Sequence, residues 1–234
     1  MKMDPQTGSL EGIGHERRKA DMRVLVMTAV PAERDVVLRG LRGDRRFDVL
    51  AGGVGAAAAA ASTARALAVG PYDLVVSAGI GGGFTGRAEV GSLVVANEII
   101  AADLGAETPD GFLSVDELGF GSARIQVPAE WAARVTEALR EAGLPVSTGP
   151  VLTVTTVTGT AETARTLGVR VPGAAAEAME GYGVAVAARQ CGLPVLEVRA
   201  ISNPVGPRDR ASWRIAEALN ALEAASSVFL EVLR

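Results

Sequence analysis

Short runs of β-branched and apolar residues alternate along this chain with Ala-rich segments of helical length. The first strand-like run covers residues 23–28, and a segment of helical length follows it directly over residues 31–41. A second strand-like run at 47–51 is followed by the Ala-rich segment 56–69. Because strands that alternate with helices become covered by those helices, the pattern predicts an α/β fold.

The spacing of the later runs predicts that the sheet is mixed. A third strand over residues 74–78 ends in a Gly-rich loop at 79–83, and the next strand-like run, 91–100, comes too soon for a long helix between them. Parallel neighbours need such a crossover, so we expect antiparallel pairs as well. Further along the chain we expect helices over residues 129–142, 161–167, 181–190 and 211–233, and strands over residues 150–157, 174–176 and 195–201.

Composition narrows the class of protein. With 234 residues, of which 48% are hydrophobic, we expect one large domain over residues 22–234, preceded by a disordered polar extension at 1–21. The net charge of −4 offers no basic face to nucleic acid, and no apolar run reaches the ~18 to 20 residues that span a bilayer. Since the first twenty residues lack a signal-peptide core, a cytoplasmic location is expected.

The scarcity of cysteine and histidine limits the chemistry. The single cysteine, Cys191, excludes an internal disulfide and a cysteine-based zinc site, and we expect it to be a small buried residue. The single histidine, His15, lies in the polar extension, so Ser-His and Cys-His hydrolases and most catalytic metal sites are excluded. Carboxylates and amides must therefore act, with no metal and no organic cofactor.

Three polar positions follow expected strands, where ligands gather in an α/β sheet. Glu33 is either a helix-start acid that the helix dipole favours or a general base. Glu180 is either another such acid or a carboxylate that binds two neighbouring sugar hydroxyls, with Met179 beneath the sugar. Asn203, after Ser202, is either part of a hydrogen-bonded turn or a rigid recognition amide.

Two Gly-rich segments, residues 52–55 and 79–83, are further candidates. Such loops let a ligand approach the backbone, whose N–H groups can face an anion or a water molecule. Neither segment has the Gly-Lys-Ser/Thr of a P-loop or the spacing of a dinucleotide-binding fingerprint. They are equally well explained as tight turns.

Together, the order and spacing of these segments resemble the nucleoside phosphorylase/hydrolase superfamily, particularly its methylthioadenosine nucleosidase and futalosine hydrolase branches, over residues 22–234. The most specific motifs are Glu33, Val-Ser-Ala-Gly-Ile-Gly-Gly at 76–82, Ala-Met-Glu at 178–180 and Arg-Ala-Ile-Ser-Asn at 199–203. The resemblance implies a single three-layer αβα domain with a central mixed sheet. It also implies a small-molecule nucleoside substrate and a homodimer or higher homo-oligomer.

The resemblance also implies roles for single residues. Glu33 matches the residue that activates the attacking water, and Met179 and Glu180 match residues that pack on and hydrogen-bond the ribose. Cleavage of an N-ribosidic bond builds positive charge on the sugar and negative charge on the base, which a carboxylate and an amide stabilise. The other residues placed at the substrate by the resemblance are Gly79, Ile80, Gly81, Val157, Ser202, Asn203 and Arg208.

Three of these residues indicate the substrate. Asn203, helped by Ser202, matches the position that engages the purine, where adenosine-type nucleosidases carry Asp and inosine-type enzymes carry Asn, so hypoxanthine is the expected base. An Asn amide can also pair with adenine. Val157 would be an apolar wall where the nucleosidases stack an aromatic ring, and Ile80 replaces a small hydroxyl residue.

The segment 202–209, with Trp213 and Arg214 after it, is most similar to futalosine hydrolases, which release hypoxanthine from an inosine with a benzoate-bearing 5′ extension in a route to menaquinone. Arg208 is then a partner for that carboxylate, or simply a solvent-facing loop charge. A methylthioadenosine/S-adenosylhomocysteine nucleosidase and an inosine-type phosphorylase are alternatives, although a phosphorylase needs more basic residues near the Gly-rich loops than Arg34 and Arg87. A non-catalytic nucleoside sensor would not need both Glu33 and Glu180.

Overall fold

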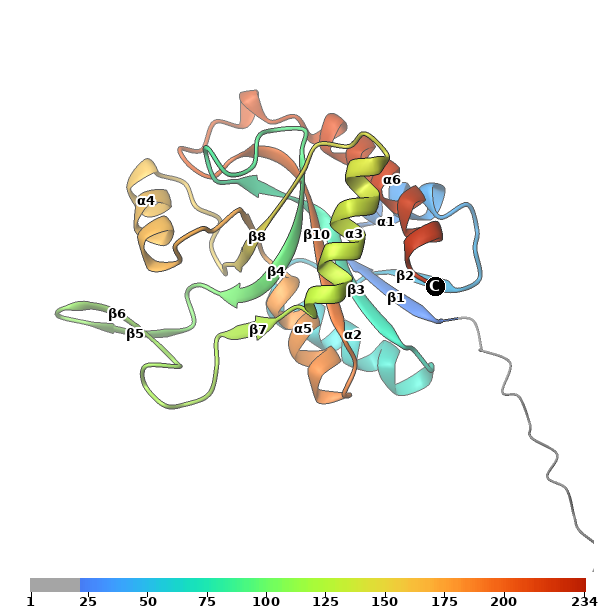
Figure 1. Ribbon diagram of the computed structural model, residues 1–234. Coiled ribbons are helices and arrows are strands. Elements are labelled where there is room, and N and C mark those ends of the chain that lie inside the picture. Colours follow the sequence, from blue (N-terminus) through green and yellow to red (C-terminus); the bar gives the residue numbers. More distant parts are fainter. Residues whose placement is uncertain (1–21) are drawn as a thin grey trace, which may run out of the picture.

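A mixed β-sheet forms the centre of the fold in a computed structural model that describes residues 22–234 (Figure 1). The expected disorder of residues 1–21 and the single histidine lie outside the described residues. The strands of this sheet are β1 (Val24–Thr28), β2 (Phe47–Ala51), β3 (Leu74–Gly83), β4 (Leu93–Ala101), β7 (Arg124–Gln126), β8 (Val146–Thr153), β9 (Ala176–Ala178) and β10 (Val195–Pro204). The helices are α1 (Pro31–Gly40), α2 (Ala56–Val69), α3 (Ala129–Glu141), α4 (Ala161–Arg170), α5 (Gly181–Gln190) and α6 (Ile215–Val232), with a short 3-10 helix at Arg210–Ser212.

Parallel and antiparallel pairs both occur in this sheet, which confirms the expected mixed sheet. β1 pairs in parallel with β2 and β3, and β3 pairs in parallel with β10. β10 and β4 run antiparallel, β4, β8 and β9 run parallel in turn, and β9 returns antiparallel to β3. The strands β3, β10, β4, β8 and β9 therefore form a closed ring. β1 and β2 extend the sheet outward from β3. This closure brings the ends of β3, β9 and β10 together.

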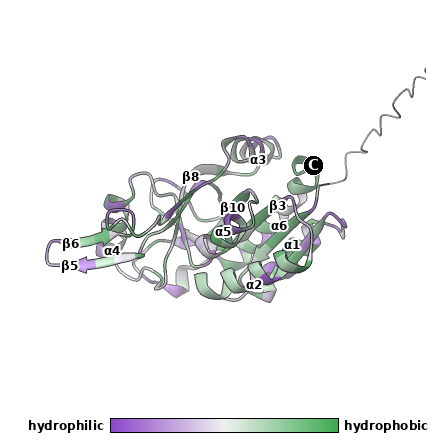
Figure 2. Cartoon of the chain, turned by 90° about the horizontal axis from the view of Figure 1, so that it is seen from below, coloured by the Kyte–Doolittle hydropathy of each residue, from purple (hydrophilic) through white to green (hydrophobic). Residues whose placement is uncertain are grey.

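Helices cover the sheet in two groups. α1 and α3 both pack on α6, and α2 packs on α5, while β3 contacts helices of both groups. The expected α/β architecture with helices on both faces is therefore confirmed. A two-stranded hairpin, β5 (Gly105–Thr108) with β6 (Gly111–Ser114), projects on the side opposite the C-terminus (Figure 2). The sequence analysis missed this hairpin because its strands are short and only half-buried.

We expected the Gly-rich segment 79–83 to be a loop, but it forms the second half of β3. Gly81 and Gly83 lie so close to neighbouring backbone that an added Cβ would stand 2.8 Å from Glu177 O and 2.2 Å from Ala88 O. Glycine here permits close strand approach and does not mark a turn. The sequence analysis therefore assigned these glycines to a loop, although they belong to a strand.

Other boundaries differ from expectation for identifiable reasons. β8 covers Val146–Thr153 and not 150–157, because the sheet accommodates Pro150 opposite Glu98, directly after a register shift between Ala96 and Glu98 of β4. α6 begins at Ile215, after the 3-10 turn, and not at residue 211. Cys191 is exposed because it caps the C-terminus of α5, so its expected burial is wrong.

Small residues set the spacing between α2 and α5. An added Cβ at Gly183 in α5 would lie only 2.0 Å from the backbone oxygen of Ala56 in α2. The two helices therefore touch through backbone, as the Ala-rich sequence of α2 permits. Across residues 22–234, none of the helices has both the length and the apolar character needed to span a membrane.

Alanine substitutions at two helical glycines should test this close contact. We expect Gly183→Ala to lower the free energy of unfolding by about 1–3 kcal/mol, because its methyl group forces α2 and α5 apart. Gly168→Ala in α4 is the matched control, since nothing lies within 4 Å of its added methyl group. Alanine favours the helix there and should add about 0.5–1 kcal/mol. Urea unfolding measures both, and equal stability of the two variants would contradict the contact.

Candidate active site

One cavity of ≈ 330 Å³ lies at the carboxyl ends of β1, β3, β9 and β10. It brings together eight residues that the sequence analysis selected from distant segments: Glu33, Ile80, Gly81, Val157, Met179, Glu180, Ser202 and Asn203. Ala29, Val30, Val54, Gly82, Thr158, Glu177, Ala178, Val205 and Trp213 complete its lining. Gly79 and Arg208 are not among the lining residues.

Glu33 is fixed at one end of this cavity by backbone donors. Its Oε2 accepts hydrogen bonds from the N–H groups of Ala29 (2.9 Å) and Val30 (3.2 Å), and its Oε1 accepts one from Ile80 (2.9 Å). The carboxylate is 3% exposed, at the third position of α1. Glu33 is therefore both an acid in the first turn of a helix and an acid that lines the cavity.

Glu180 lies beside Glu33 on the same side of the sheet. Its Oε1 accepts from the N–H of Gly55 (3.2 Å), and its Oε2 accepts from the N–H of Met179 and from Arg199 Nη1, both at 3.3 Å. The segment 52–55 therefore holds a carboxylate of this chain through Gly55, whose φ of 92° suits glycine. Met179 is half-buried on the cavity wall next to it.

Arg199 is the centre of a buried charge cluster behind the cavity. Its Nε donates to Glu197 Oε1 at 2.8 Å, its Nη2 donates to Ser77 at 2.9 Å, and Nη1 faces Glu180. Burial works to lower the pKa of Arg199, but the carboxylates of Glu197, Glu180 and Glu33 outweigh it and raise that pKa above its usual value. A single cation therefore serves three carboxylates.

The sequence analysis missed Glu197 and gave Arg199 no role. Glu197 is fully buried, and burial raises the pKa of its carboxyl group against the lowering effect of Arg199. An added Cβ at Gly181 would stand 2.2 Å from both Glu197 oxygens. The sequence signal that could have identified Glu197 and Arg199 is a pair of charges two positions apart in an otherwise apolar strand. Such side chains share one face of the strand.

Gly79 supports the site without lining it. A methyl group there would lie 2.7 Å from both Glu33 Oε1 and Arg199 Nη1. The carboxylate and the guanidinium can approach each other across this position because glycine has no side chain. The resemblance placed Gly79 in contact with substrate, whereas in the structure Gly79 lies behind the acids and does not line the cavity.

Asn203 and Ser202 lie farther along the sheet, at the other end of the cavity, because Asn203 pairs with Gly82, three residues beyond the Gly79 position where Glu33 and Arg199 meet. The hydroxyl of Ser202 lies 2.8 Å from Asn203 Oδ1 and 3.2 Å from the carbonyl oxygen of Gly81. One N–H of the Asn203 amide donates to Pro204 O at 2.9 Å, which leaves its second N–H as a donor for a ligand. Ser202 thus orients the amide so that the NH₂ group is available.

Glu177 also lines the cavity, although the sequence analysis did not select it. Its Oε1 accepts from the N–H of Thr158 at 2.9 Å, and its Oε2 accepts from the hydroxyl of the same residue. Burial raises the pKa of the Glu177 carboxyl group, and the bonds from Thr158 lower it in part. Val157, next to Thr158, contributes the apolar wall.

Arg208 is exposed and lies one side chain away from the cavity. Its guanidinium stacks 4.9 Å from the ring centre of Trp213, which lines the cavity, and Arg210 lies 5.8 Å from the same ring. The structure therefore places this positive charge at the rim and not inside. Across residues 22–234, no three His, Cys, Asp or Glu side chains form a group that could hold a metal ion.

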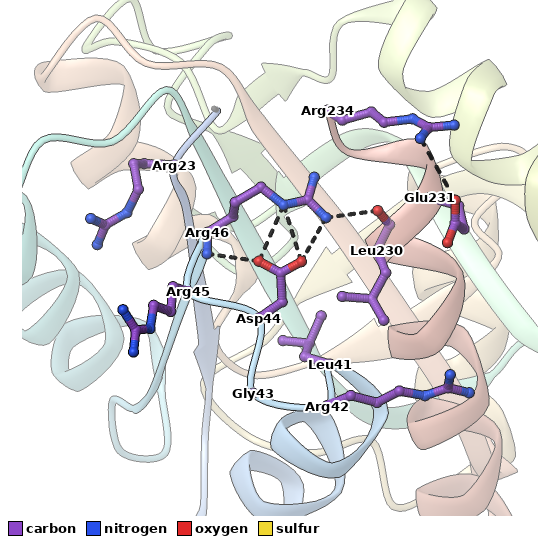
Figure 3. A pocket seen from close by; sticks show the side chains of 10 residues that line it. All are labelled: Arg23, Leu41, Arg42, Gly43, Asp44, Arg45, Arg46, Leu230, Glu231 and Arg234. Carbon is purple, nitrogen blue, oxygen red and sulfur yellow. Dashed lines mark hydrogen bonds and ion pairs between the residues drawn. The ribbon is translucent and has the colours of Figure 1, made fainter. Parts of the chain in front are cut away.

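A larger hollow of ≈ 840 Å³ lies at the opposite edge of the sheet, before β1 and β2 (Figure 3). Five arginines line it: Arg23, Arg42, Arg45, Arg46 and Arg234. Arg46 binds Asp44 and donates to the carbonyl oxygens of Leu230 and Leu233, which end α6. Because basic side chains satisfy the last carbonyls of a helix, this hollow has a structural explanation and contains no predicted site residue.

Comparisons with known proteins agree with this geometry. A sequence profile of the family described as Phosphorylase superfamily matches residues 20–234. A futalosine hydrolase of Streptomyces coelicolor is 54% identical over 232 residues, which cover 91% of this chain and 97% of that protein.

Solved structures share the fold at lower identity. A 5′-methylthioadenosine/S-adenosylhomocysteine nucleosidase from Neisseria meningitidis, in complex with methylthio-immucillin-A, has a TM-score of 0.77 at 18% identity and covers 89% of this chain and 99% of its own. The native futalosine hydrolase of Helicobacter pylori has a TM-score of 0.76 at 17% identity and covers 91% and 97%. From the profile match and the close Streptomyces relative, this chain belongs to the phosphorylase superfamily and, within it, to the futalosine hydrolase family.

Proposed function

We propose that this protein hydrolyses the N-ribosidic bond of futalosine and releases hypoxanthine. The observation that carries the proposal is the single cavity with two buried acids, Glu33 and Glu180, at one end and the amide of Asn203 at the other. The 54% identity to a futalosine hydrolase, along 97% of that protein, supports the choice of substrate. The acids suit the sugar side of the bond, and the amide suits the base.

The acids would act on the sugar. As the bond to the base lengthens, positive charge develops on the ribose ring, and nearby carboxylates stabilise it. Glu180, held by Gly55 and Arg199, is placed to accept hydrogen bonds from two adjacent ribose hydroxyls, with Met179 against the ring. Glu33 would take a proton from the attacking water, because its three backbone donors leave free lone pairs on its oxygens.

The amide would act on the base. Asn203 has no ionisable proton, so it stabilises the departing purine by donating a hydrogen bond and not by protonating it. Ser202 holds Asn203 Oδ1, and the free N–H of the amide is the donor. Val157 and Val205 line the same cavity as apolar surface for the purine ring.

Water suits this cavity better than phosphate as the second reactant. Among the described residues that line it, none is Lys or Arg, and a phosphate dianion beside Glu33 would be repelled. Arg34 is paired with Asp35 at 2.7 Å, and Arg87 is exposed and does not line the cavity. Arg199 is fully engaged behind the acids. These observations favour a hydrolase over a phosphorylase.

Several expectations stay predictions from the family resemblance. They are the homodimer or higher homo-oligomer, the cytoplasmic location and the place of the reaction in menaquinone biosynthesis. Contact between Arg208 and the carboxylate of the 5′ extension also stays a prediction, which the position of Arg208 at the rim supports. A nucleoside sensor without activity is the alternative that an absence of turnover would favour.

The substrate assay is the first test. In phosphate-free, metal-free buffer the protein should release hypoxanthine from futalosine, and its rate should exceed the rates with inosine and methylthioadenosine. Chromatography of the products identifies both the base and the sugar. A requirement for phosphate, with a sugar 1-phosphate as product, would contradict the hydrolase. Preferred release of adenine from methylthioadenosine would instead indicate a nucleosidase. A relative from Geobacillus kaustophilus at 30% identity is named 5′-methylthioadenosine/S-adenosylhomocysteine nucleosidase.

Glu33→Gln tests the general base. The variant should lose about 10²–10⁴-fold in kcat while futalosine still binds, because the amide keeps the shape of the side chain but takes up no proton. Asp35→Asn is the matched control, since Asp35 is an exposed acid on the same helix. Turnover near the wild-type rate in Glu33→Gln would remove Glu33 from the mechanism.

Arg208→Gln tests recognition of the 5′ extension. Loss of a rim charge should raise KM for futalosine by about two- to fivefold, in line with an exposed ion pair, and leave KM for inosine unchanged. Arg210→Gln serves as the comparison, because Arg210 contacts the same Trp213 ring from farther away. Equal effects on both substrates would show that Arg208 does not bind the extension.

A further inference from the structure

Glu177 and Asn203 stand on the two sides of one glycine in the sheet. Glu177 in β9 is the register partner of Gly82 in β3, and Asn203 in β10 is the register partner of the same glycine. Because neighbouring strands lie ~4.8 Å apart, roughly 10 Å separate the two Cα atoms. Residues in register on adjacent strands point to the same face, and both side chains line the cavity.

Gly82 keeps the space between them open. An added Cβ there would lie 3.3 Å from Asn203 Nδ2 and 3.1 Å from a methyl group of Val205. Any other residue at this position would crowd the Asn203 amide. The three strands thus present an acceptor, a gap and a donor in a row.

The mechanism proposed above leaves Glu177 without a function. Among the residues that the structure describes, 22–234, its one hydrogen-bond partner is Thr158, which donates from its N–H and its hydroxyl, whereas Arg199 binds Glu180 and Glu197. Each carboxylate oxygen has a second lone pair, so both can still accept a hydrogen bond. Burial of this acid at 4% exposure is costly without further donors.

A 6-oxopurine offers the complementary groups. Along one edge it carries the acceptors N7 and O6 and then the donor N1–H, whereas a 6-aminopurine carries an acceptor at N7, a donor at the 6-amino group and an acceptor at N1. We propose that Glu177 accepts the N1–H of a 6-oxopurine while Asn203 donates to its O6 or N7, so that this pair selects 6-oxopurines over 6-aminopurines. The inference rests on the proposed function and specifies which residues choose its base.

The pairing accounts for both polar ends of the gap. A donor from the base would add to the two donors of Thr158 and compensate the buried carboxylate further. Facing a 6-aminopurine, the same carboxylate would meet the lone pair of N1, and acceptor against acceptor is repulsive. Asn203 alone does not discriminate in this way, because its amide pairs with either kind of purine.

The test compares futalosine with its 6-amino analogue in the wild-type protein and in Glu177→Gln. Glutamine keeps an oxygen for Thr158 and offers an NH₂ group that can donate to N1 of a 6-aminopurine. The ratio of kcat/KM for futalosine over the analogue should fall by about 10–150-fold in the variant, the range for a hydrogen bond to a charged group. An unchanged ratio would overturn the proposal, even if both rates fell.

Two further measurements separate this role from a brace for the Thr158 loop. Thr158→Val removes the hydroxyl that holds Glu177 but leaves the carboxylate, so the base ratio should stay near the wild-type value. If Glu177→Gln does not fold, the wild-type protein is assayed with 1-deazafutalosine, in which a C–H replaces the N1–H donor. We expect about 10–150-fold lower kcat/KM than with futalosine, and equal values would overturn the proposal.

The two levels of inference fail separately. If the wild-type protein cleaves none of these nucleosides, the proposed function is wrong. If it cleaves futalosine, its 6-amino analogue and 1-deazafutalosine equally well, the function stands and only the role of Glu177 is wrong.

Discussion

The pairing of Arg199 with buried carboxylates is the interaction on which the rest of the site depends. A guanidinium that is 1% exposed holds Glu180 at 3.3 Å and Glu197 at 2.8 Å, and Glu33 lies next to it across Gly79. Removing one partner of a buried ion pair costs about 3–5 kcal/mol, because the other charge is then left without compensation. The acids can therefore sit at the floor of a cavity only because β10 brings this cation behind them. Backbone N–H groups supply the rest of the compensation.

The distribution of glycine follows from this cluster. An added Cβ at Gly79 would displace Glu33 or Arg199, and one at Gly181 would overlap the Glu197 carboxylate. Gly55 adopts a positive φ and directs its N–H to Glu180. Sites with many buried charges need backbone close to each charge, both as donor and as boundary. The glycines that resemble turn signals in the sequence are therefore largely packing positions around charged groups.

This explains which parts of the site were predictable from the sequence. Glu33, Glu180 and Asn203 were found because each follows a recognisable strand, and the resemblance placed all three at one ligand. Glu177 and Glu197 were not found, because their importance depends on neighbours from other elements, Gly82 in β3 and Gly181 in α5, which pair or pack with them only in the folded chain. For the same reason, β3 was ended too early: its last glycines are strand residues only because β9 and β10 lie beside them. The architecture followed from periodicity, which is local, whereas these contacts are not.

The carboxylates at the two ends of the cavity are compensated in different ways, and this difference explains why Asn suits position 203. Beside Glu33 and Glu180, Arg199 allows two acids to lie close together. Near Asn203, no cation contacts Glu177 in the hydrogen bonds and ion pairs of the described residues, so a second carboxylate across Gly82 would repel it and raise the pKa of both. A neutral amide avoids that repulsion and keeps an N–H that is free to donate to a ligand. Asn203 and Glu177 are therefore compatible as a pair in a way that two acids at these positions would not be.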